Sequence, residues 1–184
     1  MEHFDLVTLE GGLGAVRDAP KDNGHVELIC RRPETEQREL LDEAHLDERE
    51  GLVGDNWSIR GSSSTADGSA NPDMQLTLMN VRSASLIAGT PERRQLAGDQ
   101  FFVDFDLSVQ NLPPGSRLRI GEATVEITEI PHRGCGKFSA RFGVDALKFV
   151  NSDVGRELNL RGVNARVVAG GMVRTGDAVA KASG

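Results

Sequence analysis

Cysteine is scarce in this 184-residue sequence, which contains only Cys30 and Cys135. Two cysteines are too few for a disulfide scaffold, and in a reducing cytosol we expect both to be free thiols. Cys30 lies within HVELICR, a run rich in strand-forming residues, and is most simply a packed strand residue. Cys135 stands between two glycines in PHRGCGKF, residues 131–138, and is the candidate for chemistry.

Long apolar runs are also absent. No segment approaches the roughly 20 apolar residues that a membrane-spanning helix needs. The N-terminus, MEHFDLVTLEGGLGAV, has neither the basic region nor the apolar run of a signal peptide. We therefore expect a soluble cytoplasmic protein with no membrane partner. The length favours one domain over residues 1–184 with one sizeable core.

Net positive charge is lacking, since the formal charge is −7. This argues against a general nucleic-acid surface, which depends on clustered Lys and Arg. The charge is uneven: residues 1–55 hold fifteen acidic against six basic side chains, whereas residues 131–166 hold three acidic against seven basic ones. The excess of basic side chains over residues 131–166 is either an ordinary distribution of surface charge or a local positive field around Cys135 for a small anionic ligand.

Several common site motifs are missing. GGLGAV is not followed by the Lys-Ser or Lys-Thr of a phosphate-binding loop. Structural zinc takes four Cys or His ligands at short paired spacings, and here only His132 and Cys135 form a close pair. No spacing specifically supports a Cys-His-Asn hydrolase.

The chain reads mainly as short strands separated by turns. Strand-like composition or alternation marks residues 25–31, 75–80 and 101–108, and two runs predict hairpins at 117–130 and 164–179. Residues 34–50 predict a short helix or an irregular segment, and residues 61–73 predict a long polar loop. Without a βαβ rhythm, the pattern favours a mainly β fold: a closed or nearly closed β-barrel with a few short helices.

One helix is predicted directly after Cys135. Phe138, Phe142, Ala146 and Phe149 recur at intervals of three or four, and Gly143 weakens the helix between them. These aromatic side chains are expected in the core.

The segment around Cys135 predicts a site. A hairpin that ends at a proline, followed by a Gly-Cys-Gly turn and a helix start, would present the thiol at the mouth of the barrel. His132, Arg133 and Lys137 would each stabilise its thiolate. Such a cysteine can act as a nucleophile, a persulfide carrier or a soft metal ligand, and the residue types do not choose among these.

Five blocks, in this order, carry a family resemblance. They are GLVGDNW, QLTLMNV, GDQFFVDFDLSVQNLPPGSRLRIGEATVEIT, PHRGCGKFSARFG and RGVNARVVAGGMVRTGDAV. Together they resemble the MOSC domain, named for the C-terminal domain of molybdenum cofactor sulfurases, in its free-standing bacterial form. The similarity is clearest over residues 51–179, and residues 1–50 are then an acidic N-terminal extension or an edge of the barrel.

The resemblance implies a barrel of the pyruvate-kinase type and a site for the molybdenum cofactor, a Mo-pyranopterin. Cys135 matches the family cysteine, which implies a thiolate ligand to molybdenum; a soft thiolate suits such a centre. The pterin phosphate implies basic contacts, for which the candidates are Arg82, Arg93, Arg94, Arg133, Lys137 and Arg141. Asn80 and Asp99 fall in blocks that line the family's pocket, and His132 would be a hydrogen-bond donor or a proton source.

The function implied is reduction of an N-hydroxylated or N-oxide small molecule, with electrons from a partner protein because no flavin, haem or iron–sulfur module is recognisable. One alternative is a sulfur carrier that takes a persulfide on Cys135 from a cysteine desulfurase, for delivery to metal–sulfur centres. Another is a non-catalytic module that stores the cofactor. Pyridoxal phosphate is not expected, because the sulfurase domain of the fused proteins would not fit in this length.

Overall fold

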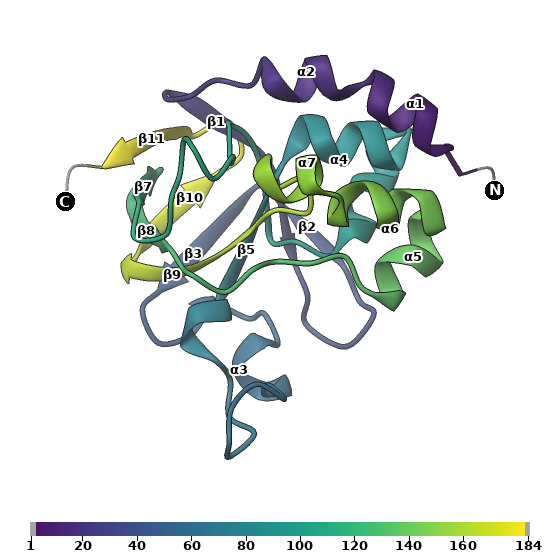
Figure 1. Ribbon diagram of the computed structural model, residues 1–184. Helices are drawn as coiled ribbons and strands as arrows, with labels where there is room; N and C mark the ends of the chain where they lie inside the picture. Colours follow the sequence, from purple (N-terminus) through teal and green to yellow (C-terminus); the bar gives the residue numbers. More distant parts are fainter. Residues whose placement is uncertain (1–2, 183–184) are drawn as a thin grey trace.

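The N-terminal helices lie across one end of the molecule. The computed structural model describes residues 3–182. Asp5 is the N-cap of helix α1 (Leu6–Gly11), and its side chain accepts a hydrogen bond from the Thr8 backbone N–H. Helix α2 (Leu13–Arg17) follows directly, and both run along the top of the view in Figure 1.

Seven strands close a mixed β-barrel, which confirms the predicted architecture. Around the barrel they are β1 (Gly24–Arg31), β11 (Ala178–Ala182), β7 (Arg117–Ile120), β8 (Ala123–Ile127), β9 (Val163–Ala169), β5 (Leu76–Asn80) and β6 (Phe101–Asp104). Closure comes from β1, which pairs with both β6 and β11. The β5–β6 pair is parallel and the other barrel pairs are antiparallel. Since β1 is a barrel strand, the acidic N-terminal part contributes to the barrel itself.

A second, smaller sheet lies beside the barrel. It contains β3 (Glu43–Asp47), β4 (Gly51–Leu52) and β10 (Gly171–Arg174), while β2 (Glu39–Leu41) extends the large sheet beyond β1. The predicted helix or irregular segment at 34–50 is therefore wrong. In β3, Ala44 and Leu46 are buried and alternate with exposed residues, so the true period is two.

The predicted hairpin at 164–179 is also wrong, because β9 and β10 belong to different sheets. β9 pairs with β5 and β8, whereas β10 pairs with β3. The chain turns a corner at Gly170, where a Cβ atom would lie 2.6 Å from the Leu46 carbonyl oxygen. That close approach of two backbones requires glycine. The hairpin at 117–130 is confirmed by the pairing of β7 with β8.

The barrel interior is the first of two hydrophobic cores. Alternate residues of the strands fill it, including the fully buried Leu78, Phe101, Leu118 and Val125. Each such side chain contributes about 1.5–3 kcal/mol relative to exposure. Residues that face the other way, such as Cys30 and Phe102, pack into a second core under the helices. Cys30 is thus the packed strand residue that its position predicts.

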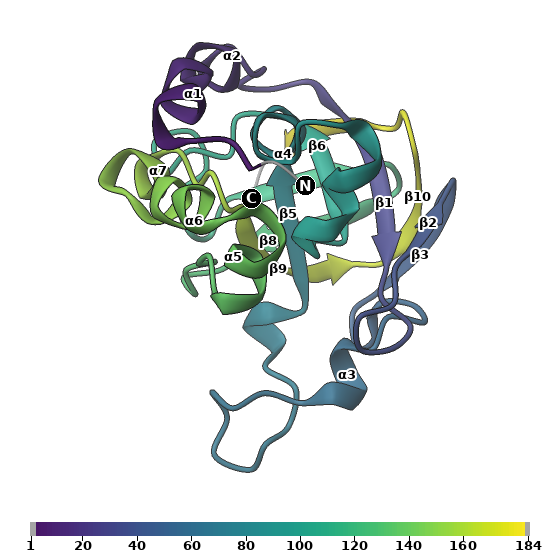
Figure 2. The same ribbon diagram turned by 90° about the vertical axis from the view of Figure 1, so that its right-hand side faces the viewer.

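Helices cover one side of the barrel, as Figure 2 shows. They are α4 (Val81–Ala88), the 3-10 helix Pro91–Ala97, α5 (Gly136–Phe142), α6 (Val144–Asn151) and α7 (Asp153–Glu157). Gly143, with φ +93, separates α5 from α6, and Phe138, Phe142 and Phe149 are buried in the second core as predicted. None of the helices within residues 3–182 has the length and apolar character that crossing a membrane requires.

A polar arm projects from the opposite end of the barrel. It consists of helix α3 (Trp57–Arg60), the loop at 61–71 and the 3-10 helix Pro72–Met74, and it extends to the bottom of the view in Figure 1. The loop predicted at 61–73 is confirmed over residues 61–71, and its last two residues begin the 3-10 helix. Trp57 is buried at its base, whereas Ile59 is 86% exposed.

Candidate functional site

A strap of residues 128–135 carries Cys135 from the barrel to the helices, crossing the front of the molecule in Figure 1. Asn164 and Asn151 hold it in place. The Asn164 side-chain amide donates to the Ile130 carbonyl at 2.9 Å, and Asn151 both accepts from the Gly134 N–H at 3.0 Å and donates to its carbonyl at 3.1 Å. The strap passes close to α6 at Gly134, where a Cβ would lie 2.8 Å from methyl groups of Leu147 and Val150, so a larger residue there would displace these side chains.

Cys135 is exposed and is the residue before helix α5. It lines a cavity of about 240 Å3, which we name the Cys135 pocket. Six cationic side chains line this pocket: Arg32, Arg38, Arg60, Lys137, Arg141 and Arg161. Two carboxylate side chains, Glu34 and Glu36, also line it. The pocket therefore combines a thiol with an excess of positive charge, which suits an anionic ligand.

One of these cations is fixed by the carboxylate of the Gly-Asp block. Asp55 is fully buried and accepts from Arg32 Nε at 2.9 Å and from Nη2 at 2.8 Å. The same carboxylate accepts from the Trp57 backbone N–H at 3.0 Å. Asp55 therefore orients Arg32 and anchors the base of the arm.

A second buried group lies behind the pocket. The fully buried Asp99 carboxylate accepts from Arg161 Nη1 at 2.5 Å, and its other oxygen is 3.4 Å from His132 Nδ1. The Arg161 guanidinium also lies over the Phe138 ring, 5.1 Å from its centroid. Burial raises the pKa of Asp99 above its ordinary value, against the opposing effect of Arg161.

His132 is held in its neutral form. Its side chain is 16% exposed. Burial, together with the charges of Arg161, Arg32 and Arg60, places the pKa of His132 well below 6.5. A neutral imidazole is a hydrogen-bond partner and a weak base, and at neutral pH it has no acidic proton to give.

Unpaired polar atoms gather at the Cys135 pocket. Among the described residues, five pocket-lining side chains have a buried polar atom without a hydrogen-bond partner: Arg38 Nε, Asn56 Oδ1, His132 Nδ1, Arg161 Nε and Asn164 Oδ1. Buried polar groups in folded proteins are almost always satisfied, so exceptions clustered in one place indicate a site for polar ligand atoms or water.

The loop before β2 reaches across to α5 through Glu36. Its carboxylate accepts from Lys137 Nζ at 3.0 Å and also from Arg141 Nη2. These two cations, Lys137 first, lower the pKa of Glu36. Glu36 has φ +65, a conformation that side chains other than Asn and Asp rarely adopt. The Glu36 carboxylate thus pairs with two of the pocket's cations.

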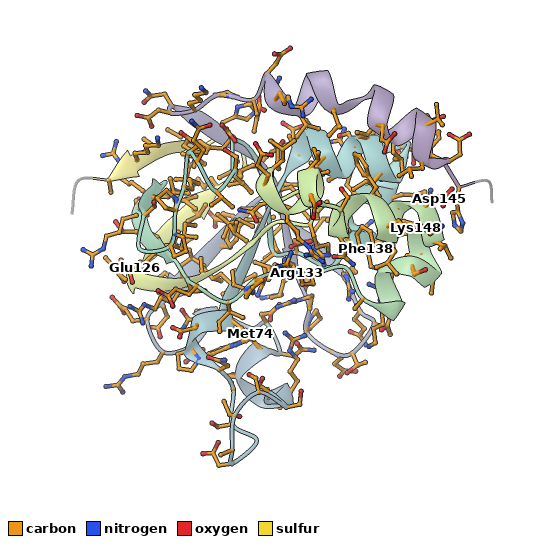
Figure 3. The ribbon with its side chains drawn as sticks, viewed as in Figure 1. Met74, Glu126, Arg133, Phe138, Asp145 and Lys148 are labelled. Atoms are coloured by element: carbon orange, nitrogen blue, oxygen red, sulfur yellow. The ribbon has the colours of Figure 1, made fainter. Side chains whose placement is uncertain are left out.

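The structure brings five of the sequence-predicted site residues together. Cys135, His132, Lys137 and Arg141 line the pocket, and Asp99 lies behind it, bonded to Arg161. Arg133 belongs to an adjacent cavity, and Figure 3 shows it between the barrel and Phe138 of α5.

The other candidates lie elsewhere. Arg82 pairs with Asp104 at 2.7 Å beside a separate hollow, and Asn80 caps α4 by accepting from the Arg82 backbone N–H at 2.9 Å. Arg93 donates to the Ala88 carbonyl at 2.9 Å and to the Arg141 carbonyl, and Arg94 lies 3.5 Å from Glu27. These four residues are not among those that line the Cys135 pocket.

Sequence reasoning missed four of the pocket's cations: Arg32, Arg38, Arg60 and Arg161. Three of them lie in or near the acidic first part of the chain, where the local charge balance gave no signal. Arg161 begins the closing block, RGVNARVVAGG, far in the sequence from Cys135.

Comparison with known proteins decides the family. The family model of the MOSC domain matches residues 69–180, more than half of the chain. The chain belongs to the MOSC domain family. No curated protein matches it. The matched part of this MOSC domain includes Asp99, Cys135 and Arg161, whereas Arg32 and Arg60 lie before it.

Solved structures share the fold. The YuaD protein from Bacillus subtilis superposes with a TM-score of 0.60 at 18% identity, covering 85% of this chain and 94% of that one. YiiM from Escherichia coli gives a TM-score of 0.55 at 21% identity, covering 86% of this chain and 70% of that chain. YiiM from Geobacillus stearothermophilus gives a TM-score of 0.54 at 11% identity, covering 90% of this chain and 75% of that chain. At these identities the likeness concerns the fold alone.

Proposed function

We propose that this MOSC domain is a cytoplasmic protein that binds the molybdenum cofactor, with the Cys135 thiolate as a ligand to the metal. The observation that carries the proposal is an exposed thiol in a pocket lined by six cations. Thiolate is a soft ligand that suits a sulfur-rich molybdenum centre, and the cations suit a phosphate-bearing pterin.

The donor set fits a metal that arrives with most of its own ligands. In the described part of the chain, no three His, Cys, Asp or Glu side chains gather as a metal site. Cys135 would therefore be the protein's single ligand, and the pterin dithiolene would supply other sulfurs. A cavity of about 240 Å3 is slightly smaller than the roughly 300 Å3 lower bound for drug-sized ligands, so it would enclose a pterin only in part.

The pocket's six cations divide into three pairs. Arg32 and Arg161 are committed to buried carboxylates, and Lys137 and Arg141 both pair with Glu36. Arg38 and Arg60 line the pocket without an ion pair to a described residue, and burial lowers the pKa of each below the usual arginine value. We assign the phosphate to Arg38 and Arg60, since a guanidinium can bind phosphate in a bidentate manner.

When bound, the molybdenum centre supplies oxygen-atom transfer. We propose an N-hydroxylated or N-oxide small molecule as substrate: it takes up two electrons and two protons, its N–O bond breaks, and the oxygen leaves as water. The electrons come from a partner protein. Because His132 is neutral at neutral pH, the protons come from solvent, and the ring serves as a hydrogen-bond partner.

The reaction is tested with cofactor-loaded protein, an aryl hydroxylamine and reduced methyl viologen as artificial donor. Wild type and Cys30→Ala should form the amine, because Cys30 is buried in the second hydrophobic core. Cys135→Ala should lose the activity. If cofactor-loaded wild-type protein forms no amine, the assignment as a reductase is rejected.

A sulfur carrier is the second candidate, favoured by the accessibility of Cys135. The thiol is exposed, and apart from the adjoining residues and the backbone of α5, no atom lies within 4 Å of where a Cβ of Gly136 would stand. A cysteine desulfurase persulfide would pass its terminal sulfur to the Cys135 thiolate and be left as a thiol. Mass spectrometry should then show a gain of one sulfur on wild type and none on Cys135→Ala; an unmodified wild-type thiol would reject this candidate.

A further inference from the structure

A second cavity of about 250 Å3 adjoins the Cys135 pocket. His132 and Asn164 line both, so these two side chains form a shared wall. The second cavity lies between the strap, the turn after β6 and the end of the helical layer. Its apolar lining includes Leu112, Ile127 and Val150, all nearly fully buried.

Two arginines give the second cavity its charge. Arg133 and Arg156 both line it, and neither side chain forms an ion pair or a hydrogen bond with another described residue. Glu129 is the one carboxylate in the lining, so the net charge is positive. An apolar floor with unpaired guanidinium groups complements a ligand that has an apolar body and an anionic end.

Asn164, in the wall that the two cavities share, adds a polar group to the lining. It is only 1% exposed, and its amide nitrogen donates to the Ile130 carbonyl at 2.9 Å. Its oxygen, Oδ1, has no hydrogen-bond partner among the described residues. A buried acceptor of this kind needs a donor, which an N–H or O–H group of a ligand would supply.

We propose that the second cavity is a separate small-molecule site for an aromatic carboxylate that bears an amino or hydroxyl group. The ring packs on the apolar floor, the carboxylate binds Arg133 and Arg156, and the donor group binds Asn164 Oδ1. The site does not depend on molybdenum or on the Cys135 thiol. The cavity is below drug size, which restricts the ligand to about one ring.

The test is isothermal titration calorimetry of the full chain with 4-aminobenzoate, and with 4-aminobenzamide as the uncharged counterpart. Wild type should bind the carboxylate and bind the amide at least tenfold more weakly. Arg133→Gln and Arg156→Gln should each weaken carboxylate binding about tenfold to a hundredfold, the range for one charge-assisted hydrogen bond. Glu129→Gln should tighten it, a direction that partial unfolding would not produce.

Two controls complete the design. Arg119→Gln removes an exposed arginine on β7, away from the cavity, and should bind as wild type does. Cys135→Ala should also bind as wild type, so this site can stand or fall apart from the proposed molybdenum function. Absence of carboxylate binding, equal affinity for the amide, or Arg133→Gln and Arg156→Gln variants that match Arg119→Gln would overturn the proposal.

Discussion

Arg161 donates a hydrogen bond to the fully buried carboxylate of Asp99 at 2.5 Å. Asp99 precedes β6 and Arg161 precedes β9, so the pair joins two barrel strands, and Arg161 lines the Cys135 pocket. Removing one partner of a buried pair leaves an uncompensated charge. That cost usually exceeds the net contribution of the intact pair.

Asp99→Asn should therefore reduce the free energy of unfolding by about 3–5 kcal/mol. The matched control is Asp145→Asn, which breaks an exposed pair with Lys148 at 3.5 Å and should cost less than about 1 kcal/mol. Urea denaturation of both variants measures the difference. Equal losses in the two would contradict the assigned role of the buried pair.

The two cysteines should differ sharply in reactivity. Cys135 is exposed, whereas Cys30 is fully buried and its pKa is raised to about 11 by burial. Since the thiolate is the reactive form, iodoacetamide at neutral pH should label Cys135 in the native protein and Cys30 only after unfolding. Peptide mapping by mass spectrometry measures this. Native labelling of Cys30 at a comparable rate would show that the second core is open.

Gly162, next to Arg161, should not tolerate a side chain. Its φ is +101, and a Cβ would lie 2.3 Å from the Leu78 carbonyl oxygen. Gly176 has φ +89, but apart from its two chain neighbours no atom lies within 4 Å of such a Cβ. Gly176→Ala should thus cost about 1–3 kcal/mol from backbone strain alone, and Gly162→Ala clearly more. Thermal unfolding of the two variants compares them, and the reverse order would refute the close approach.

Stability should fall in acid partly because of His132. Its folded-state pKa is below the unfolded value of 6.5, so as pH decreases the unfolded chain takes up a proton before the folded chain does. This contribution is complete above pH 6.5 and is lost as pH falls toward the folded pKa. The raised pKa of Asp99 acts in the opposite direction.

Comparing wild type with His132→Gln isolates the His132 contribution. When the pH is lowered from 7.5 to 5.5, the urea concentration at the midpoint of unfolding should decrease more for wild type than for the variant. If the urea midpoint decreases equally in the variant and in wild type, then burial and the charges of Arg161, Arg32 and Arg60 do not lower the pKa of His132.

Local patterns predicted the barrel well. Alternation in β7 and β8 marked a true hairpin, and the spacing of Phe138, Phe142 and Phe149 marked the helices. The errors arose where tertiary contacts decide. Residues 43–47 are a strand because Ala44 and Leu46 pack inside beside β10, and the chain leaves the barrel at Gly170 because another backbone lies against it.

The site was predictable only in part. Cys135, His132, Lys137 and Arg141 are close in sequence, so one segment showed them all. Arg32, Arg38 and Arg60 reach the pocket from an acidic region, through folding that no local pattern reports. Arg82 was a candidate for the pterin phosphate, yet Asp104 holds it beside a separate hollow.

The most direct measurement is molybdenum content by elemental mass spectrometry, on wild type, Cys135→Ala and Cys30→Ala purified from a host that makes the cofactor. Our account predicts near-stoichiometric metal in wild type and Cys30→Ala, and its loss in Cys135→Ala. Folded protein without metal in all three, or equal metal in all three, would contradict the assignment of Cys135 as the molybdenum ligand.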